Sequence, residues 1–123
     1  MKIDEVLAQT DELQPNQYDD AIKISWLSKL DQKIYEELIQ NYEKDADTPS
    51  EFHGYSVNDV SASLLADDAF SDMYVDYLFA MMNYINQESE RYVNSMQMFE
   101  EKYKQYTAWY NKTHTHIRRN YSL

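Results

Sequence analysis

Glycine and proline are almost absent from this chain, which has one glycine (Gly54) and two prolines (Pro15 and Pro49) among its 123 residues. Tight turns depend on these two residue types, and folds built from many short strands use them repeatedly. The chain therefore has few sharp joints and must be built from long segments. This scarcity predicts an all-α fold with a small number of long helices.

Apolar side chains recur at helical spacing in four stretches, which predicts helices at about 2–13, 19–42, 71–87 and 89–115. The stripe of the second helix begins at Ile22 or Lys23 and continues through Leu27, Leu30, Ile34 and Leu38. The polar sequence between the last two helices predicts a long antiparallel hairpin. We expect a small helical bundle at residues 1–113, followed by an extended basic tail at 114–123.

The last helix carries an aromatic seam whose members are spaced by three and four residues. The seam residues are Tyr92, Met96, Phe99, Tyr103, Tyr106 and Tyr110, with Trp109 beside them. This spacing is typical of a helix that packs against others along its length. Two interpretations stay open: the rings fill the core with their hydroxyls at its rim, or they form a subunit interface. These seven residues are our candidates for subunit packing.

Residues 43–70 interrupt the helical pattern and contain the glycine, one proline and several acidic residues. A loop of this length is uncommon inside a compact domain and is often functional. We predict an irregular acidic loop that lies outside the core and contacts another subunit or another protein. The candidate contact residues are Phe52, His53, Tyr55, Asp67 and Asp68.

The charge of the chain is divided unevenly along its length. Residues 1–100 contain 21 acidic and 6 basic residues, whereas residues 101–123 contain 1 acidic and 5 basic residues, so the formal net charge is −11. The acidic body repels DNA phosphate, which argues against sequence-specific DNA binding by the body. Two interpretations of the acidic residues stay open. They form an ordinary solvated surface, or they attract a basic tail to the acidic body.

Sequence patterns of enzymes and metal sites are missing. The chain has no cysteine and no glycine-rich phosphate loop. His114 and His116 would diverge by about 200° on a helix, and neither completes the Glu-x-x-His pattern of carboxylate-bridged metal bundles. We therefore expect no catalytic residues, no metal and no cofactor. No apolar stretch approaches the roughly 20 residues of a membrane span and no signal-peptide pattern is present, so we expect a protein without membrane association.

A string of aromatic, asparagine and methionine positions resembles a known family. In the second half these positions are Leu64-Leu65, Tyr74, Tyr77-Leu78, Asn83-Tyr84-Ile85, Glu88, Arg91-Tyr92, Asn94-Ser95-Met96, Met98-Phe99, Tyr103 and Trp109-Tyr110-Asn111 with His114. In the first half they are Pro15, Lys23, Trp26-Leu27, Leu30-Asp31 and Tyr35. Together they resemble the head–tail connector proteins (adaptor or head-completion proteins) of long-tailed phages and prophages of Gram-positive bacteria. The family often has Asn-Gly-Glu where this chain has Asn86-Gln87-Glu88.

The resemblance implies a structural protein of the virion, located at the head–tail interface and assembled in the host cytoplasm. It implies a twelvefold ring of this chain that docks on the portal protein, extends the DNA channel and binds a further connector or tail-completion protein. Packaged DNA would only pass through the channel. The acidic loop would then contact a neighbouring subunit or a tail-side partner.

The basic tail is the element expected to dock on the portal. Its candidate residues are His114, His116, Ile117, Arg118, Arg119 and Tyr121. Direct contact with DNA phosphate is a competing use of the two arginines. An alternative function for the whole chain is that of an acidic DNA mimic, which would inhibit a host nucleic-acid-binding enzyme.

Overall fold

The computed structural model describes residues 1–44 and 48–117. These residues form four α-helices and three short 3-10 helices, and the described ranges contain no strand. The predicted all-α fold is confirmed. The α-helices are α1 (Ile3–Leu13), α2 (Asp20–Glu37), α3 (Asp72–Ile85) and α4 (Ser89–Thr113), and the 3-10 helices are η1 (Ile39–Asn41), η2 (Val57–Asp59) and η3 (Asp68–Phe70).

Two helices end earlier than the apolar pattern predicts. The pattern carries the second helix to residue 42, but α2 ends at Glu37 because Leu38 leaves helical geometry with φ −122° and ψ −70°. The chain then continues through the tighter turn of η1. The last helix ends at Thr113 rather than at residue 115, since His114 is extended with φ −124° and ψ 148°.

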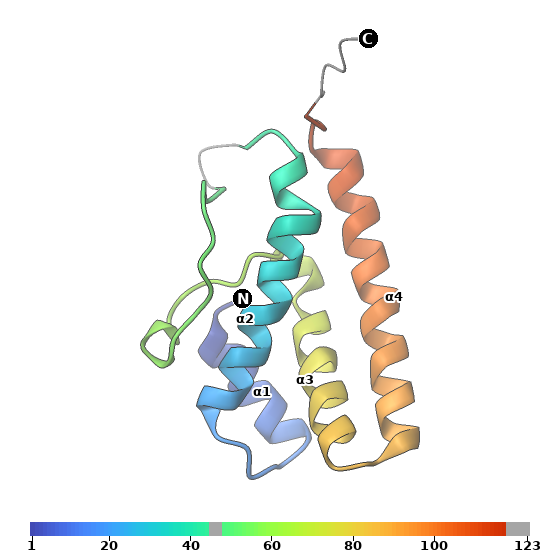
Figure 1. Ribbon diagram of the computed structural model, residues 1–123. Helices are drawn as coiled ribbons and strands as arrows, with labels where there is room; N and C mark the ends of the chain where they lie inside the picture. The colour runs from blue at the N-terminus through green and yellow to red at the C-terminus, as the bar shows by residue number, and fades with distance from the viewer. Residues whose placement is uncertain (45–47, 118–123) are drawn as a thin grey trace.

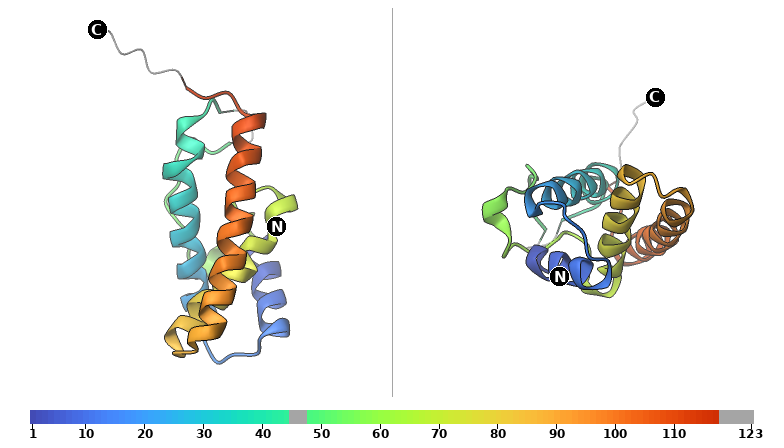
Figure 2. Two further views of the ribbon diagram at one scale, coloured as in Figure 1. Left: turned by 90° about the vertical axis from the view of Figure 1, so that its right-hand side faces the viewer. Right: turned by 90° about the horizontal axis from the view of Figure 1, so that it is seen from below.

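The helices α2, α3 and α4 run side by side along the bundle, and α1 packs against its lower half (Figure 1). The short link between α3 and α4 lies at one end of the molecule, together with the link between α1 and α2 (Figure 2). We call this the hairpin end. The C-terminus of α4 and η1 lie at the opposite end, which we call the tail end (Figure 2).

The core fills the space between the four helices. Its fully buried apolar side chains include Ile3, Val6, Leu27, Ile34, Met73, Leu78 and Met82. The stripe of α2 passes through Lys23, which is only 2% exposed, and leaves Ile22 40% exposed. The Lys23 ammonium donates to Asp11 Oδ1 at 2.6 Å and to Asn16 Oδ1 at 3.1 Å. These partners compensate the burial of the charge and fix the link between α1 and α2.

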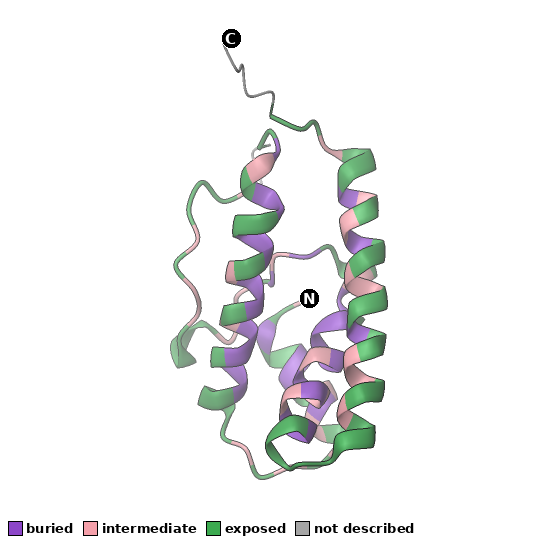
Figure 3. Cartoon of the chain, turned by 45° about the vertical axis from the view of Figure 1, so that its right-hand side comes forward, coloured by how far each residue is buried: buried purple, intermediate pink, exposed green. Residues whose placement is uncertain are grey.

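The helix α4 buries a narrow inner face and exposes most of its surface (Figure 3). Its buried residues are Phe99, Tyr106 and Tyr110. The Phe99 ring lies 5.1 Å from the Tyr77 ring of α3. One ion pair adds to this contact, as the Lys102 ammonium lies 2.6 Å from the Asp76 carboxylate. The aromatic seam therefore contributes to the protomer's own core at these three positions.

The prediction that residues 43–70 stay outside the core is wrong. Leu64 and Ala66 are buried in the same core as the helices. Backbone hydrogen bonds also join this segment to the start of the chain, because the amide of Ile3 donates to the Ala62 carbonyl at 3.0 Å and the amide of Leu64 donates to the Met1 carbonyl at 2.9 Å. The segment is part of the fold, and its removal would open the core.

The single glycine brings this segment against α2. Gly54 has a φ of +88°, and a Cβ at this position would lie 2.5 Å from Ser28 Oγ. The same Oγ accepts a hydrogen bond of 3.0 Å from the amide of Tyr55. Glycine satisfies both the left-handed backbone and the close approach. This explains why the chain's one glycine lies in the loop and not at a helix joint.

At the joint between α3 and α4, a residue other than glycine adopts the left-handed backbone conformation. Gln87 has a φ of 60°, a conformation that costs a residue with a Cβ about 1 kcal/mol or more. We expect Gln87→Gly to raise the free energy of unfolding by about 0.5–1 kcal/mol in urea denaturation, because it removes this strain. The matched control is Gln97→Gly in the exposed interior of α4, which should lower stability by about 1 kcal/mol. Equal losses of stability in Gln87→Gly and Gln97→Gly would contradict the assignment of backbone strain to Gln87.

Candidate functional site

A buried carboxylate joins three parts of the chain. Asp31 of α2 is fully buried and accepts hydrogen bonds from the hydroxyl of Tyr55, from the hydroxyl of Tyr74 at 2.6 Å and from the amide of Leu65 at 3.0 Å. The Tyr74 hydroxyl in turn accepts from the amide of Ala66 at 2.9 Å. Because this carboxylate is closed off from solvent, it cannot reach a substrate. Its role is to hold the segment of residues 55–66 and α3 against α2.

The environment of Asp31 disfavours its charged form. Burial raises the pKa of the Asp31 carboxyl, and the hydrogen bonds from Tyr55 and Tyr74 offset this only in part. Burial and the nearby Asp31 charge also raise the pKa of the Tyr74 hydroxyl. A carboxyl whose pKa is higher in the folded state than in the unfolded state stabilises the fold at low pH. That contribution is lost as the pH rises through the folded-state pKa.

The pH dependence of stability gives a direct measurement of this effect. We expect the free energy of unfolding of the wild type, relative to Asp31→Asn, to fall as the pH rises from 4 towards 8, because only the wild type has a carboxyl to ionise at this site. Urea denaturation at several pH values measures the difference between the two proteins. Asp72→Asn, at an exposed position in the first turn of α3, is the control. A difference between wild type and Asp31→Asn that stays constant with pH would contradict the raised pKa.

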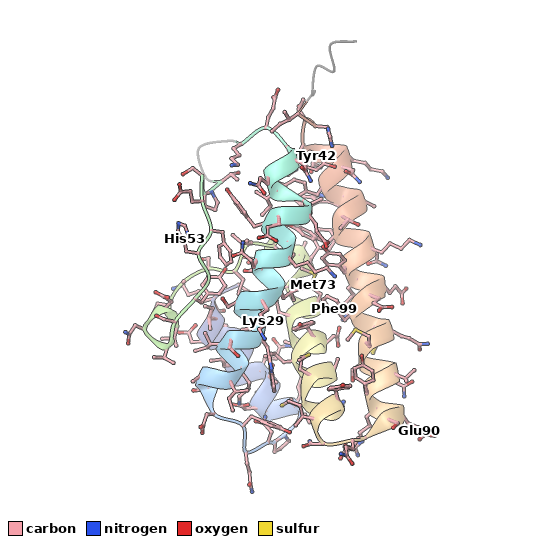
Figure 4. All side chains as sticks on the ribbon, viewed as in Figure 1. Lys29, Tyr42, His53, Met73, Glu90 and Phe99 are labelled. Carbon is pink, nitrogen blue, oxygen red and sulfur yellow. The ribbon has the colours of Figure 1, made fainter. Side chains whose placement is uncertain are left out.

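Aromatic rings gather at the tail end and form what we call the tail-end cluster: Tyr42, Tyr106, Trp109, Tyr110 and His114. The rings of Tyr110 and His114 stack at 3.7 Å with an interplanar angle of 1°. The Tyr42 ring lies 5.0 Å from the Tyr110 ring in an edge-to-face arrangement, and Figure 4 labels Tyr42 beside the last turns of α4. The cluster fixes where the chain leaves α4.

A cavity of about 220 Å³ opens beside the tail-end cluster. Its lining includes Pro49, Leu65, Asp67, Tyr106, Trp109 and His114. The walls are polar and apolar in equal measure, and one acidic group, Asp67, lies among them. Such a cavity can accept one apolar or aromatic side chain of a partner.

Residues 115–117 pair with the chain's own residues 41–43. The amide of Glu43 donates to the Thr115 carbonyl at 2.8 Å, and the amide of Ile117 donates to the Asn41 carbonyl at 3.0 Å. Tyr42 and His116 form an antiparallel bridge, with their rings 5.0 Å apart. The sequence predicts an extended tail whose residues contact another protein. Thr115 and Ile117 instead have backbone partners within the protomer.

The remaining tail candidates Arg118, Arg119 and Tyr121 lie outside the described residues. They follow directly from Ile117, which the backbone pairing holds at the tail end. The structure thus describes the chain up to the residue that precedes the basic segment.

The loop candidates divide into inward and outward groups. Tyr55 points inward to Asp31, and Phe52 packs between Tyr55 and Tyr35, with ring distances of 5.1 Å and 6.1 Å. The outward residues are His53, Asp67 and Asp68. His53 pairs with Glu51 at 2.9 Å, and its label in Figure 4 stands on the outer side of the loop. Asp68 pairs with the amino group of Met1.

The seam candidates divide into a buried group and a half-buried group. Phe99, Tyr106 and Tyr110 are buried, whereas Tyr92, Met96, Tyr103 and Trp109 are half-buried. The Tyr103 hydroxyl donates to Glu37 at 3.3 Å, and burial together with this carboxylate raises the pKa of Tyr103 to about 12. Lys33 lies over the same ring, 5.4 Å from its centroid. Tyr103 therefore ties α4 to α2 at the rim of the core.

Sequence reasoning missed Asp31 as a key residue, although a signal was present. Asp31 lies four residues after Leu27 and three before Ile34, which is the phase of the buried stripe of α2. An acidic residue in that phase indicates a buried carboxylate, but its tyrosine partners cannot be identified from spacing because they lie 24 and 43 residues away.

Within residues 1–44 and 48–117, no group of three or more histidine, cysteine, aspartate or glutamate side chains is placed to hold a metal ion. In the same residues, none of the helices combines the length and the apolar character needed to cross a membrane. No protein-family model, no curated protein and no solved structure matches this chain.

Proposed function

We propose that this chain is a head–tail connector of a long-tailed phage or prophage, which forms a ring on the portal, extends the DNA channel and binds a further connector or tail protein. The proposal rests on the resemblance of its aromatic, asparagine and methionine positions to that family. Several of these positions are structural contacts in the bundle. Tyr74 bonds to Asp31, the Asn83 amide donates to Ser95 at 3.1 Å, and Tyr110 stacks on His114.

The anchored start of the basic segment is the observation that carries the docking role. Stacking of His114 and backbone pairing of residues 115–117 hold the chain at the tail end up to Ile117. The basic pair Arg118 and Arg119 therefore begins one residue after an anchored position of the chain. Presentation from a fixed point lowers the entropy lost on binding and favours charge-assisted hydrogen bonds to carboxylates on a portal.

The hairpin of α3 and α4 provides the surface for ring packing in this proposal. The outer face of α4 is exposed along its length (Figure 3), and the half-buried seam residues Tyr92, Met96 and Tyr103 border it. Aromatic and methionine side chains are enriched at subunit interfaces. The outward loop residues His53 and Asp67 provide a second surface for a neighbouring subunit or a tail-side protein.

The docking role is tested with Arg118→Ser/Arg119→Ser and the purified portal protein from the same genome. We expect at least a tenfold loss of affinity in surface plasmon resonance, because two charge-assisted contacts are removed. The matched control is Lys104→Ser/Lys112→Ser, which removes the same charge from exposed positions on α4 and should change the affinity less than twofold. Portal binding at wild-type affinity by the arginine variant would refute the docking role. If the arginine variant keeps its affinity for the portal but loses binding to duplex DNA, the two arginines contact DNA phosphate.

A further inference from the structure

The hairpin end carries an exposed apolar pocket that the fold does not use. The pocket has a volume of about 510 Å³, and its lining includes Asn83, Tyr84, Ile85, Glu88, Tyr92 and Val93. Tyr84 is 63% exposed, and Ile85 and Val93 are each 49% exposed. Apolar side chains that gather in a concave surface in this way are typical of a binding site.

The pocket is held in shape by hydrogen bonds beneath it. Asn83 is buried, and its amide donates to Ser95 of α4 at 3.1 Å while its carbonyl oxygen accepts from Gln14 at 3.0 Å. The Tyr18 hydroxyl donates to Asn86 Oδ1 at 2.6 Å. These contacts lock both interhelical links together. The pocket is thus formed before any partner binds, which reduces the free-energy cost of binding.

The hairpin end as a whole is acidic, and Glu88 lines the pocket itself. Residues 11–23 and 83–94, which form the hairpin end, contain six acidic and two basic residues, a difference of −4. Both basic residues already have carboxylate partners: Lys23 pairs with Asp11 at 2.6 Å, and Arg91 pairs with Glu88 at 3.4 Å. Glu90 is exposed at this end (Figure 4). A partner that fits must combine apolar side chains with positive charge.

The chain's own C-terminal segment has this composition. Ile117 is exposed, and the next six residues are Arg118, Arg119, Asn120, Tyr121, Ser122 and Leu123. The segment provides two positive charges together with aromatic and aliphatic side chains, and it contains no acidic side chain. It complements the hairpin end in both charge and apolar character.

The segment cannot reach the pocket of its own protomer. The helix α4 has 25 residues and is therefore about 37 Å long at 1.5 Å per residue. The tail end and the hairpin end lie at its two ends, and Ile117 is fixed at the tail end by its bond to Asn41. Tyr121 can lie at most about 14 Å from Ile117, and Leu123 at most about 21 Å. Contact between this segment and a hairpin-end pocket therefore requires a second copy.

We propose that the hairpin-end pocket binds residues 117–123 of a second copy of this chain, with Tyr121 or Leu123 in the pocket and the two arginines on the acidic rim. This contact joins different surfaces of the two copies, so it is head-to-tail and leaves one free pocket and one free segment at the ends of every open assembly. The inference goes beyond the connector function, since it concerns contact between copies in the absence of a portal. A segment held in this way is not free for a portal.

Complementation between two variants gives the decisive test. Val93→Lys places a positive charge in the pocket and keeps the segment, whereas a chain ending at Ile117 keeps the pocket and lacks the segment. In sedimentation velocity without portal, we expect the mass of the wild type to rise with concentration and each variant alone to stay monomeric. An equimolar mixture of the two variants should form a 1:1 dimer that grows no further. A monomeric mixture, a monomeric wild type or self-association of the shortened chain would overturn the proposal.

A peptide assay locates the contact. The probe is an amidated peptide of residues 114–123, titrated into the chain ending at Ile117 by calorimetry. We expect saturable binding that weakens at high salt and at least tenfold weaker binding to the Val93→Lys form. Met98→Lys, an exposed position on the same helix but outside the pocket, is the control and should bind as the parent does. Equal binding to the Val93→Lys and Met98→Lys forms would overturn the assignment to the pocket. Because no portal is present, these results are independent of the portal test.

Discussion

Replacement of Phe99 by aspartate is expected to lower the free energy of unfolding by about 4 kcal/mol or more. Loss of a buried phenylalanine side chain costs about 3–5 kcal/mol, and the new carboxylate would be buried among apolar rings. The neighbouring rings are those of Tyr77 and Tyr103, at 5.1 Å and 5.6 Å. Lys102, one turn further along α4, already pairs with Asp76. Lys102 is thus not free to compensate the new charge.

The adjacent residue provides a matched control. Met98 is 51% exposed whereas Phe99 is 5% exposed, so Met98→Asp adds the same charge to the same helix with an expected change within about 0.5 kcal/mol. Urea denaturation followed by circular dichroism measures both variants. Because typical domains are stable by about 5–15 kcal/mol, the Phe99 variant should lose a large share of its stability. Equal stability of the two variants would show that the seam is not part of the core.

Replacement of Tyr74 by phenylalanine is expected to cost about 3 kcal/mol, although it removes one oxygen atom only. The Tyr74 hydroxyl donates to Asp31 at 2.6 Å and accepts from the amide of Ala66 at 2.9 Å. Its loss leaves a buried amide without an acceptor and a buried carboxylate with one donor fewer, and each such group costs about 1–3 kcal/mol. The effect is large because water cannot enter to replace the oxygen.

Two further variants identify the origin of this loss. Tyr84→Phe removes a hydroxyl from an exposed ring and should change stability by less than about 0.5 kcal/mol. Tyr74→Phe in the background of Asp31→Asn should cost less than in the wild type, because the two residues share one hydrogen bond. Additive effects of the two substitutions in urea denaturation would mean that the hydroxyl acts without Asp31.

The sequence predicted the helical part of the fold because burial follows helical spacing there. Phe99, Tyr106 and Tyr110 of α4 are buried as the spacing of the seam indicates, whereas Tyr92, Met96 and Tyr103 of the same seam are half-buried. The predicted helix ends were less accurate. Leu38 is apolar and continues the apolar spacing of α2, but it leaves helical geometry and the chain continues as η1. The spacing of apolar residues shows which face of a helix is buried, but it contains little information on the residue at which the last hydrogen bond of the helix is made.

The polar core could not be predicted from the sequence because its contacts join distant residues. Asp31 and Tyr74 are separated by 43 residues, and no local pattern indicates that they meet. Residues 43–70 lack periodicity, so the burial of Leu64 and Ala66 was missed. The hairpin-end pocket depends in a similar way on contacts between Gln14 and Asn83, which are 69 residues apart.

The pairing of residues 115–117 with residues 41–43 has a mechanical consequence. A helix that is pulled at its end unwinds one turn at a time, because each step breaks only the last hydrogen bonds. Here a pull on the chain beyond Ile117 first meets the bonds to Asn41 and Glu43. The force is therefore shared between the end of α4 and the segment of η1 and Glu43, and these two hydrogen bonds must break before α4 can unwind from its end. Tension applied to the tail thus loads two separate segments of the chain at once.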